Sequence, residues 1–207
     1  MFKGNTKTHK VWRNANVQDQ IDKADATFRR GQFNDAVRQY DAVLGHAPDN
    51  FRALHNKGLA LFALGKFEES IACYNKALKI RPHESHVALN KAIALNSSKN
   101  FQEAKCLLDE LIRVSPTSKE ALNARALSEF NLGLDREGMD DLGEAIKIDP
   151  TYTMAWNNLG SFYLGLGDLD LAIDCFDHTL AIDSGNYDAF LLKDMAVEKR
   201  ERRSKRL

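Results

Sequence analysis

Residues 153–186 read TMAWNNLGSFYLGLGDLDLAIDCFDHTLAIDSGN, and this stretch decides the fold. Its apolar residues recur at helical spacing twice, once before and once after the segment Gly165-Leu166-Gly167. Glycines at such a break mark a turn rather than a phosphate-binding loop, because no lysine-containing phosphate motif accompanies them. The stretch therefore predicts two helices joined by a tight turn.

The four prolines of the chain show that this unit is repeated. Pro48, Pro82, Pro116 and Pro150 follow one another at intervals of 34 residues. Because proline cannot continue a helix and favours the first turn of the next one, each proline separates two helix pairs. The period divides the chain into five blocks, whose positions we number 1 to 34: 17–50, 51–84, 85–118, 119–152 and 153–186.

Side-chain size follows the same period. Small residues at positions 8 and 20 let the two helices of a block approach closely, and a bulky residue at position 24 fills the space beside them. Position 8 holds Ala24, Gly58, Ala92, Ala126 and Gly160; position 20 holds Ala36, Ser70, Ala104, Gly138 and Ala172; position 24 holds Tyr40, Tyr74, Leu108, Leu142 and Phe176.

These residues resemble the tetratricopeptide repeat family, whose pattern is W-x2-L-G-x2-Y, then A-x3-F, then P. The fifth block matches it with Trp156, Leu159, Gly160, Tyr163, Ala172 and Phe176. The resemblance covers residues 17–186 and implies an all-α fold, a right-handed superhelical solenoid of five helix-turn-helix repeats plus a C-terminal capping helix. It also implies that the first helix of each repeat lines a concave groove.

The two ends differ in composition from the repeats. Residues 1–16 form a basic N-terminal segment, whose Trp12 we expect to dock on the first helix. Residues 187–207 predict a capping helix with a basic tail, in which Tyr187, Phe190 and Leu191 cover the open face of the fifth block.

Composition narrows the class of protein. The chain has 207 residues, of which 43% are hydrophobic, and its 29 basic residues balance 29 acidic ones. A zero net charge argues against a body built for nucleic acid or an anionic membrane. No apolar run approaches the roughly 18 residues of a membrane helix, and no secretory signal is recognisable, so we expect a cytoplasmic protein.

Residues for catalysis or metal binding are not recognisable either. No Walker, H-E-x-x-H or G-x-S-x-G motif occurs, so we expect neither an enzyme nor a cofactor. His83 and His86 lack a third ligand nearby, and the aspartates after Gly167 lack the glycine and glutamate of a calcium loop, so we expect no metal site. Cys73, Cys106 and Cys175 are expected to be reduced packing residues of second helices.

The groove implied by the resemblance is the candidate site. It consists of positions 2, 5, 6, 9, 12 and 13 of each first helix, where asparagine is concentrated and charge is scarce. An asparagine amide can pair with both the N–H and the C=O of an extended peptide. The alternative is that asparagine is simply common at position 6 of this family. The candidate peptide-binding residues are Asn56, Leu59, Phe62, Asn90, Ile93, Asn123, Leu127, Phe130, Asn157 and Asn158.

One function known in the family can be tested by residue. Members that bind the acidic C-terminal tails of heat-shock chaperones use a clamp of lysine, arginine and asparagine. Of the corresponding residues in the first three blocks only Asn56 matches, whereas Asp25 and His86 stand at other clamp positions. Without a cationic pair to hold two carboxylates, we do not expect binding of such tails.

The fourth block departs most from the pattern. Glu129 replaces the large aromatic residue of the family pattern at position 11, and the second helix contains Gly138 and Gly143. Gly138 either permits close packing or, together with Gly143, makes this block a soft joint.

The sequence as a whole predicts a non-catalytic protein-protein interaction scaffold that binds an extended peptide or a helix of a protein partner in the concave groove. The alternative is an adaptor that binds nucleic acid or an acidic partner through residues 1–16 and 198–207. Self-association through the open solenoid ends is a further option.

Overall fold

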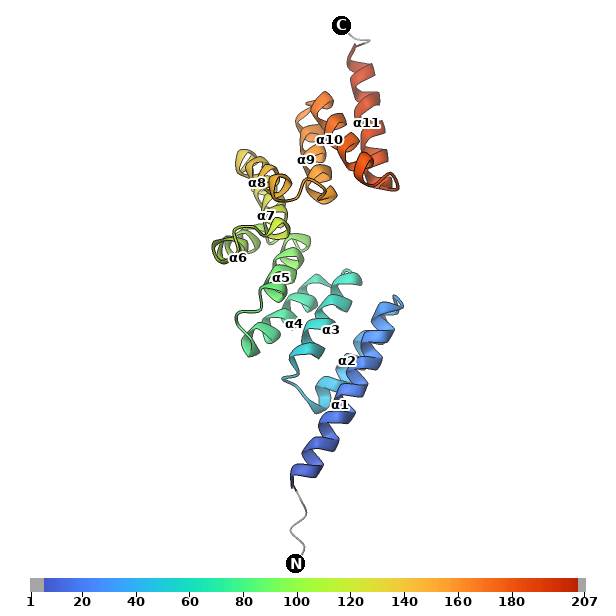
Figure 1. The fold of residues 1–207 in the computed structure, drawn as a ribbon, viewed down its shortest axis with the longest axis vertical. Coiled ribbons are helices and arrows are strands. Elements are labelled where there is room, and N and C mark those ends of the chain that lie inside the picture. Colours follow the sequence, from blue (N-terminus) through green and yellow to red (C-terminus); the bar gives the residue numbers. More distant parts are fainter. Residues whose placement is uncertain (1–5, 205–207) are drawn as a thin grey trace, which may run out of the picture. The chain divides into compact units, whose positions relative to one another are not determined.

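The structure is a computed structural model that describes residues 6–204, with side chains described from Val17 onward. The described residues form eleven helices and no strand (Figure 1). The helices are α1 (Thr6–Arg29), α2 (Phe33–His46), α3 (Phe51–Ala63), α4 (Phe67–Ile80), α5 (Ser85–Ser97), α6 (Phe101–Val114), α7 (Lys119–Asn131), α8 (Asp135–Ile148), α9 (Thr153–Leu166), α10 (Leu169–Ile182) and α11 (Tyr187–Ser204). The all-α class expected from the sequence is thereby confirmed.

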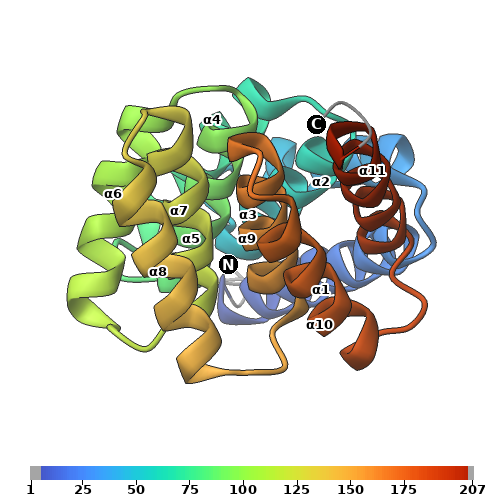
Figure 2. The same cartoon turned by 90° about the horizontal axis from the view of Figure 1, so that it is seen from above.

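The chain divides into two compact units, Met1–Lys99 with α1 to α5 and Asn100–Leu207 with α6 to α11. In unit 1, α1 packs against α2 and α3 against α4; in unit 2, α7 packs against α8 and α9 against α10. Pro48 and Pro150 each lie between two such pairs, and Pro82 and Pro116 lie between α4 and α5 and between α6 and α7, so each proline separates two helices at the interval that the 34-residue period predicts. Figure 2 shows unit 2 ending in the α9 and α10 pair with α11 beside α10.

Helix boundaries follow from residues at two positions of the repeat. At position 34, the side chains of Asn50, Ser118 and Asn186 accept a hydrogen bond from the backbone N–H three residues later, which caps the next helix. At position 15, the chain turns with a positive φ, for example +85° at Gly167 and +65° at Lys99. Glycine adopts this backbone conformation without steric cost, which explains its recurrence at this position.

The close approach predicted at position 8 is confirmed. A Cβ atom on Gly58 would lie 2.5 Å from the ring of Tyr74, and one on Gly160 would lie 2.7 Å from the ring of Phe176. Both rings are almost fully buried. Glycine is therefore needed at these two positions because the ring of the paired helix occupies the space of a side chain.

Gly138 has the same role in the fourth repeat. A Cβ atom there would lie 2.4 Å from the ring of Phe130, so this glycine permits the packing of an aromatic side chain of α7. A Cβ atom on Gly143, in contrast, would have no neighbouring atom within 4 Å.

An ion pair recurs between consecutive repeats. It joins the aspartate at position 25 of one repeat to the cation at position 7 of the next: Asp41 with Lys57 at 2.6 Å, Asp109 with Arg125 at 2.8 Å and Asp177 with Lys193 at 2.5 Å. Position 25 of the second and fourth repeats holds Asn75 and Gly143, which cannot form it. Ion pairs near the surface contribute about 0–1 kcal/mol each, so this pair adds little to the stability of the fold except where it belongs to a larger cluster, as Arg125 does.

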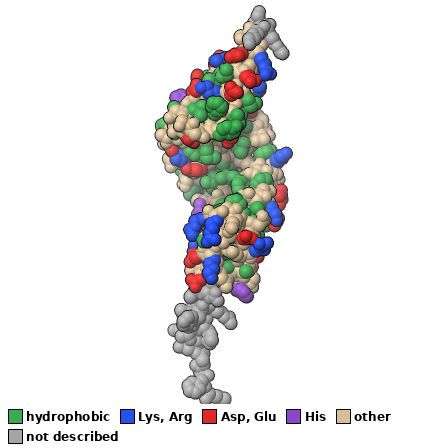
Figure 3. All heavy atoms as spheres, turned by 90° about the vertical axis from the view of Figure 1, so that its right-hand side faces the viewer, with side chains coloured by type: hydrophobic (Ala, Val, Ile, Leu, Met, Phe, Trp, Pro, Cys, Tyr) green, Lys and Arg blue, Asp and Glu red, His purple; other side chains and the backbone are tan. Residues whose placement is uncertain are grey.

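The capping helix docks with a different face from the one that we predicted. Ala189 and Ala196 are buried against α10, with Leu192 and Val197 packed beside them. Tyr187, Phe190 and Leu191, which were expected to cover the fifth repeat, are 69%, 57% and 42% exposed, so that prediction was wrong. The small alanines allow α11 to lie close to α10, which turns the larger side chains outward. Figure 3 shows hydrophobic side chains gathered on unit 2.

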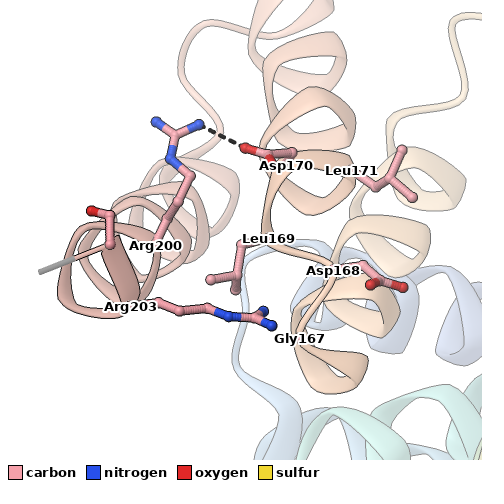
Figure 4. A pocket seen from close by; sticks show the side chains of 8 residues that line it. Gly167, Asp168, Leu169, Asp170, Leu171, Arg200 and Arg203 are labelled. Atoms are coloured by element: carbon pink, nitrogen blue, oxygen red, sulfur yellow. Dashed lines mark hydrogen bonds and ion pairs between the residues drawn. The ribbon is translucent and has the colours of Figure 1, made fainter. Parts of the chain in front are cut away.

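The basic end of α11 lies against the turn between α9 and α10. Arg200 forms an ion pair with Asp170 at 2.9 Å, and Arg203 extends toward Gly167 (Figure 4). A cavity of about 440 Å³ lies between these residues. Arg200 thus brings the basic tail into contact with an acidic side chain of the fifth repeat. Residues 205–207 of that tail and the side chain of Trp12 lie outside the described part of the chain.

Substitution of two glycines of unit 2 tests the packing. Gly160→Ala should destabilise the protein by about 1–3 kcal/mol, because the added methyl group overlaps the ring of Phe176. The matched control Gly143→Ala, which has open space, should stabilise it by up to about 1 kcal/mol through helix propensity. Urea unfolding measures both, and equal effects of the two substitutions would contradict the packing.

Candidate functional site

The candidate site is the first-helix face, which we define as positions 2, 5, 6, 9, 12 and 13 of the first helix of each repeat. In unit 1 it lies on α1, α3 and α5, and in unit 2 on α7 and α9. The ten predicted binding residues are divided equally between the units. Asn56, Leu59 and Phe62 lie on α3, Asn90 and Ile93 on α5, Asn123, Leu127 and Phe130 on α7, and Asn157 and Asn158 on α9.

A buried carboxylate organises the first-helix face of unit 1. Asp25 is 9% exposed and accepts hydrogen bonds from the Tyr40 hydroxyl at 2.6 Å and from Asn56 Nδ2 at 2.8 Å. Arg52 forms an ion pair with Asp25 and another, at 2.9 Å, with Asp22. Burial, together with the neighbouring Asp25 carboxylate, raises the pKa of Tyr40 above its usual range, so its hydroxyl remains a donor. Asp25 therefore ties α1, α2 and α3 together.

A histidine and an asparagine connect α3 with α5 in the same unit. Asn90 Nδ2 lies 3.1 Å from His55 Nε2, and the ring of His55 lies 5.0 Å from that of His86. Burial lowers the pKa of His55, and His86 lowers it further. The ring is therefore neutral at neutral pH and can accept the hydrogen bond of the amide at Nε2.

In unit 2 the corresponding bond joins two asparagines. Asn158 Nδ2 donates to Asn123 Oδ1 at 2.8 Å, and Asn123 is only 7% exposed. Asn157 Nδ2 lies 3.5 Å from Asn186 Oδ1, whereas its own Oδ1 is buried without a hydrogen-bond partner among the described residues. Asn123 consequently lies beneath the surface, where it positions Asn158, and its contact with a ligand remains a prediction.

The three asparagines at position 6 follow one rule. Asn56, Asn90 and Asn158 each direct Nδ2 toward a side chain of the preceding first helix. A carboxamide has a second N–H and an oxygen, which these three bonds do not use. The fourth repeat has Ala124 at this position, and it is buried. Position 6 thus fixes the amide of each of these asparagines by a bond to the preceding first helix.

Apolar side chains lie beside these amides. Leu127 is 46% exposed, and Phe130 stacks on Phe162 with ring centroids 3.9 Å apart. In unit 1, Leu59 and Phe62 are partly buried against the core between α3 and α5. The first-helix face of unit 2 therefore combines apolar side chains with uncharged polar ones and has Glu120 as its one charged residue, while that of unit 1 contains the Asp25 network.

Sequence reasoning found the asparagines but missed their partners. Asp25 was considered only at a position of the chaperone-tail clamp, and Tyr40 only as a packing residue. An acidic residue facing a tyrosine hydroxyl in the core could have indicated this network. Whether the two side chains lie close together, however, depends on how α1 and α2 cross.

Other sequence features can now be placed. Gly167, with its φ of +85°, ends α9, which confirms a turn at this glycine, whereas Gly165 and Leu166 still belong to the helix. Cys73 and Cys175 are buried and free, whereas Cys106 is exposed on α6, contrary to the expected packing role. Within residues 6–204, no three potential ligands from histidine, cysteine, aspartate and glutamate come together as a metal site. Nor does any helix there have both the length and the hydropathy that crossing a bilayer requires.

Comparison with protein-family models identifies the repeat. Three models, each described as tetratricopeptide repeat, match residues 21–85, 61–127 and 142–174. The chain belongs to the tetratricopeptide repeat family. The fold expected for tetratricopeptide repeats, helix pairs in sequential antiparallel packing followed by a capping helix, agrees with the structure within each unit.

Solved structures of other tetratricopeptide repeat proteins have the same fold. PilW, a type IV pilus biogenesis factor, matches with a TM-score of 0.79 at 17% identity over 89% of this chain and 86% of its own. MamA from Desulfovibrio magneticus matches with a TM-score of 0.71 at 20% identity, over 83% of this chain and 97% of its own. YrrB, described as having an unusual peptide-binding site, matches with 0.65 at 17% identity over 92% and 98%. No curated protein sequence matches the chain.

The Asp25 network provides a test of the site's architecture. Asp25→Ala should destabilise the protein by about 2–4 kcal/mol, because it leaves the buried Tyr40 hydroxyl without its acceptor and removes a partner of Arg52. Asp22→Ala, at a side chain that is 54% exposed, is the control and should change stability by less than about 0.5 kcal/mol. Urea unfolding measures both; similar losses for the two variants would refute the central role of Asp25.

Proposed function

We propose that this tetratricopeptide repeat protein is a non-catalytic scaffold that binds an extended segment of a protein partner on its first-helix faces. Tetratricopeptide repeat proteins are typically protein-protein interaction scaffolds. The finer proposal, a peptide held by backbone hydrogen bonds, rests on the amides at position 6.

The observation that carries the proposal is the fixed orientation of these amides. Asn56, Asn90 and Asn158 are each held by a bond to the preceding first helix, so their side chains are already ordered before a ligand arrives. Ordering a side chain in advance lowers the entropic cost of binding. The remaining N–H and the oxygen of each amide match the C=O and N–H of an extended peptide.

Apolar side chains between the amides suggest the second part of the interaction. Leu127 and the stacked pair of Phe130 and Phe162 offer hydrophobic contact on unit 2. Ile93 and Phe62 have the equivalent place on unit 1. Because few side chains of the face are charged, we expect recognition of a segment with apolar side chains and little net charge.

Three further observations support this proposal. Asp25, with its network of donors, occupies the face where a chaperone-tail clamp would need cations. In the basic tail, Arg200 and Arg202 form ion pairs with Asp170 and Glu198, which leaves less free charge for nucleic acid or an acidic partner. YrrB, which has the same fold, is described as having a peptide-binding site.

Peptides selected from a random display library against the full chain would test the proposal. For a selected peptide, Asn90→Ala and Asn158→Ala should each weaken binding by about 1–2 kcal/mol, because backbone groups of the peptide lose a partner. Asn75→Ala on the exposed surface of α4 is the control and should leave affinity unchanged. Titration calorimetry measures the affinities, and urea unfolding checks that the variants remain folded.

The salt dependence of the same binding gives a second criterion. Affinity should change by less than about threefold between 50 and 200 mM salt, because the face contains few charges. A tenfold loss of affinity over that range, or selected peptides that bind the Asn158→Ala variant equally well, would contradict the proposal.

A further inference from the structure

Glu129 on α7 is the most unusual buried group in unit 2. Its residue is 3% exposed, and it stands at position 11, where the second, third and fifth repeats have Leu61, Leu95 and Tyr163. Its Oε2 atom is buried without a hydrogen-bond partner among the described residues. Its Oε1 atom lies 3.7 Å from Arg125 Nε and 3.8 Å from Lys105 Nζ, too far for a hydrogen bond.

The cations beside Glu129 are already engaged by other carboxylates. Arg125 makes two hydrogen bonds to Asp141, at 2.6 and 2.7 Å, and a third to Asp109 at 2.8 Å. Lys105 pairs with Asp109 at 3.0 Å. Arg125 and Lys105 balance Asp109 and Asp141 in charge, so an ionised Glu129 adds one negative charge that no cation is left to compensate.

These four residues are the charged groups that face Glu129 from the helices around it. Lys105 and Asp109 come from α6, Arg125 from α7 itself and Asp141 from α8. Within unit 2, α7 also packs against α9, which contains no charged residue. An uncompensated charge at this place is costly because water cannot solvate it.

We propose that Glu129 is a proton-operated latch, which holds α6, α7 and α8 together when it is protonated and loosens them when it ionises. Burial, with the repulsion of Asp141, raises the pKa of Glu129 to about 7, against 4.5 for a free side chain. A raised pKa in the folded state means that stability is complete below pH 4.5 and is lost as the pH rises through 7. The latch therefore acts in the physiological range, and its action does not depend on what the first-helix face binds.

The variant Glu129→Gln tests the latch in the full chain, since glutamine has nearly the same shape and leaves the four remaining charges balanced. The ratio of its folding equilibrium constant to that of the unmodified protein should rise by at least about tenfold between pH 5 and pH 8. Because both proteins share all other titratable groups, the ratio isolates Glu129. Glu110→Gln, at an exposed position of α6, is the control and should give a constant ratio.

Hydrogen exchange locates the effect. Amides of α7 and α8 should exchange faster at pH 8 than expected from the intrinsic pH dependence, and Glu129→Gln should abolish this excess. A constant stability ratio for Glu129→Gln between pH 5 and 8, or no excess exchange in these helices, would overturn the proposal.

A direct titration keeps the proposal testable even if the variant does not fold. Carbon-detected NMR of glutamate-labelled unmodified protein follows the Glu129 carboxyl, which should titrate near pH 7 rather than near 4.5. A midpoint within the ordinary range of glutamate would refute the latch.

Discussion

The close contact between a glycine of the first helix and an aromatic ring of the second determines how closely the helices of the second and fifth tetratricopeptide repeats pack. At Gly58 and Gly160 the ring of the second helix occupies the place of a Cβ atom. This contact fixes the distance between the two helices, and therefore which residues of the first helix remain on its outer face. The orientation of the asparagines on that face depends on this spacing.

The helix pairs and their boundaries could be predicted from the sequence because their causes are local. Pro48, Pro82, Pro116 and Pro150 cannot lie within a helix, and the pattern of small and bulky positions specifies which faces meet. The face of α11 that docks could not be predicted in this way. The sequence of α11 offers two helical faces, one with large apolar residues and one with alanines. Only the packing against α10 shows that the alanine face is the one that docks.

The candidate site was predicted in part. The sequence identified the asparagines at position 6, and the structure shows that the bond of each amide to the preceding first helix is a common feature of both units. Their partners are Asp25 at position 9 and His55 and Asn123 at position 5 of the preceding repeat, and which side chains meet depends on how the helices pack. The cluster around Glu129 was missed for the same reason, since α6, α7 and α8 each contribute to it.

In unit 2, the residue at position 8 and the residue that it faces at position 24 are complementary in size. This relation gives the most direct test of the packing. Gly160 lies against Phe176, whereas Ala126 in the neighbouring pair is combined with Leu142. A double-mutant cycle of Gly160→Ala and Phe176→Leu recreates the second combination at the first site. We predict that the leucine relieves the overlap, with a favourable coupling of about 1 kcal/mol or more in urea unfolding. Additive effects, within about 0.3 kcal/mol, would show that the glycine and the ring do not determine the spacing of the helices.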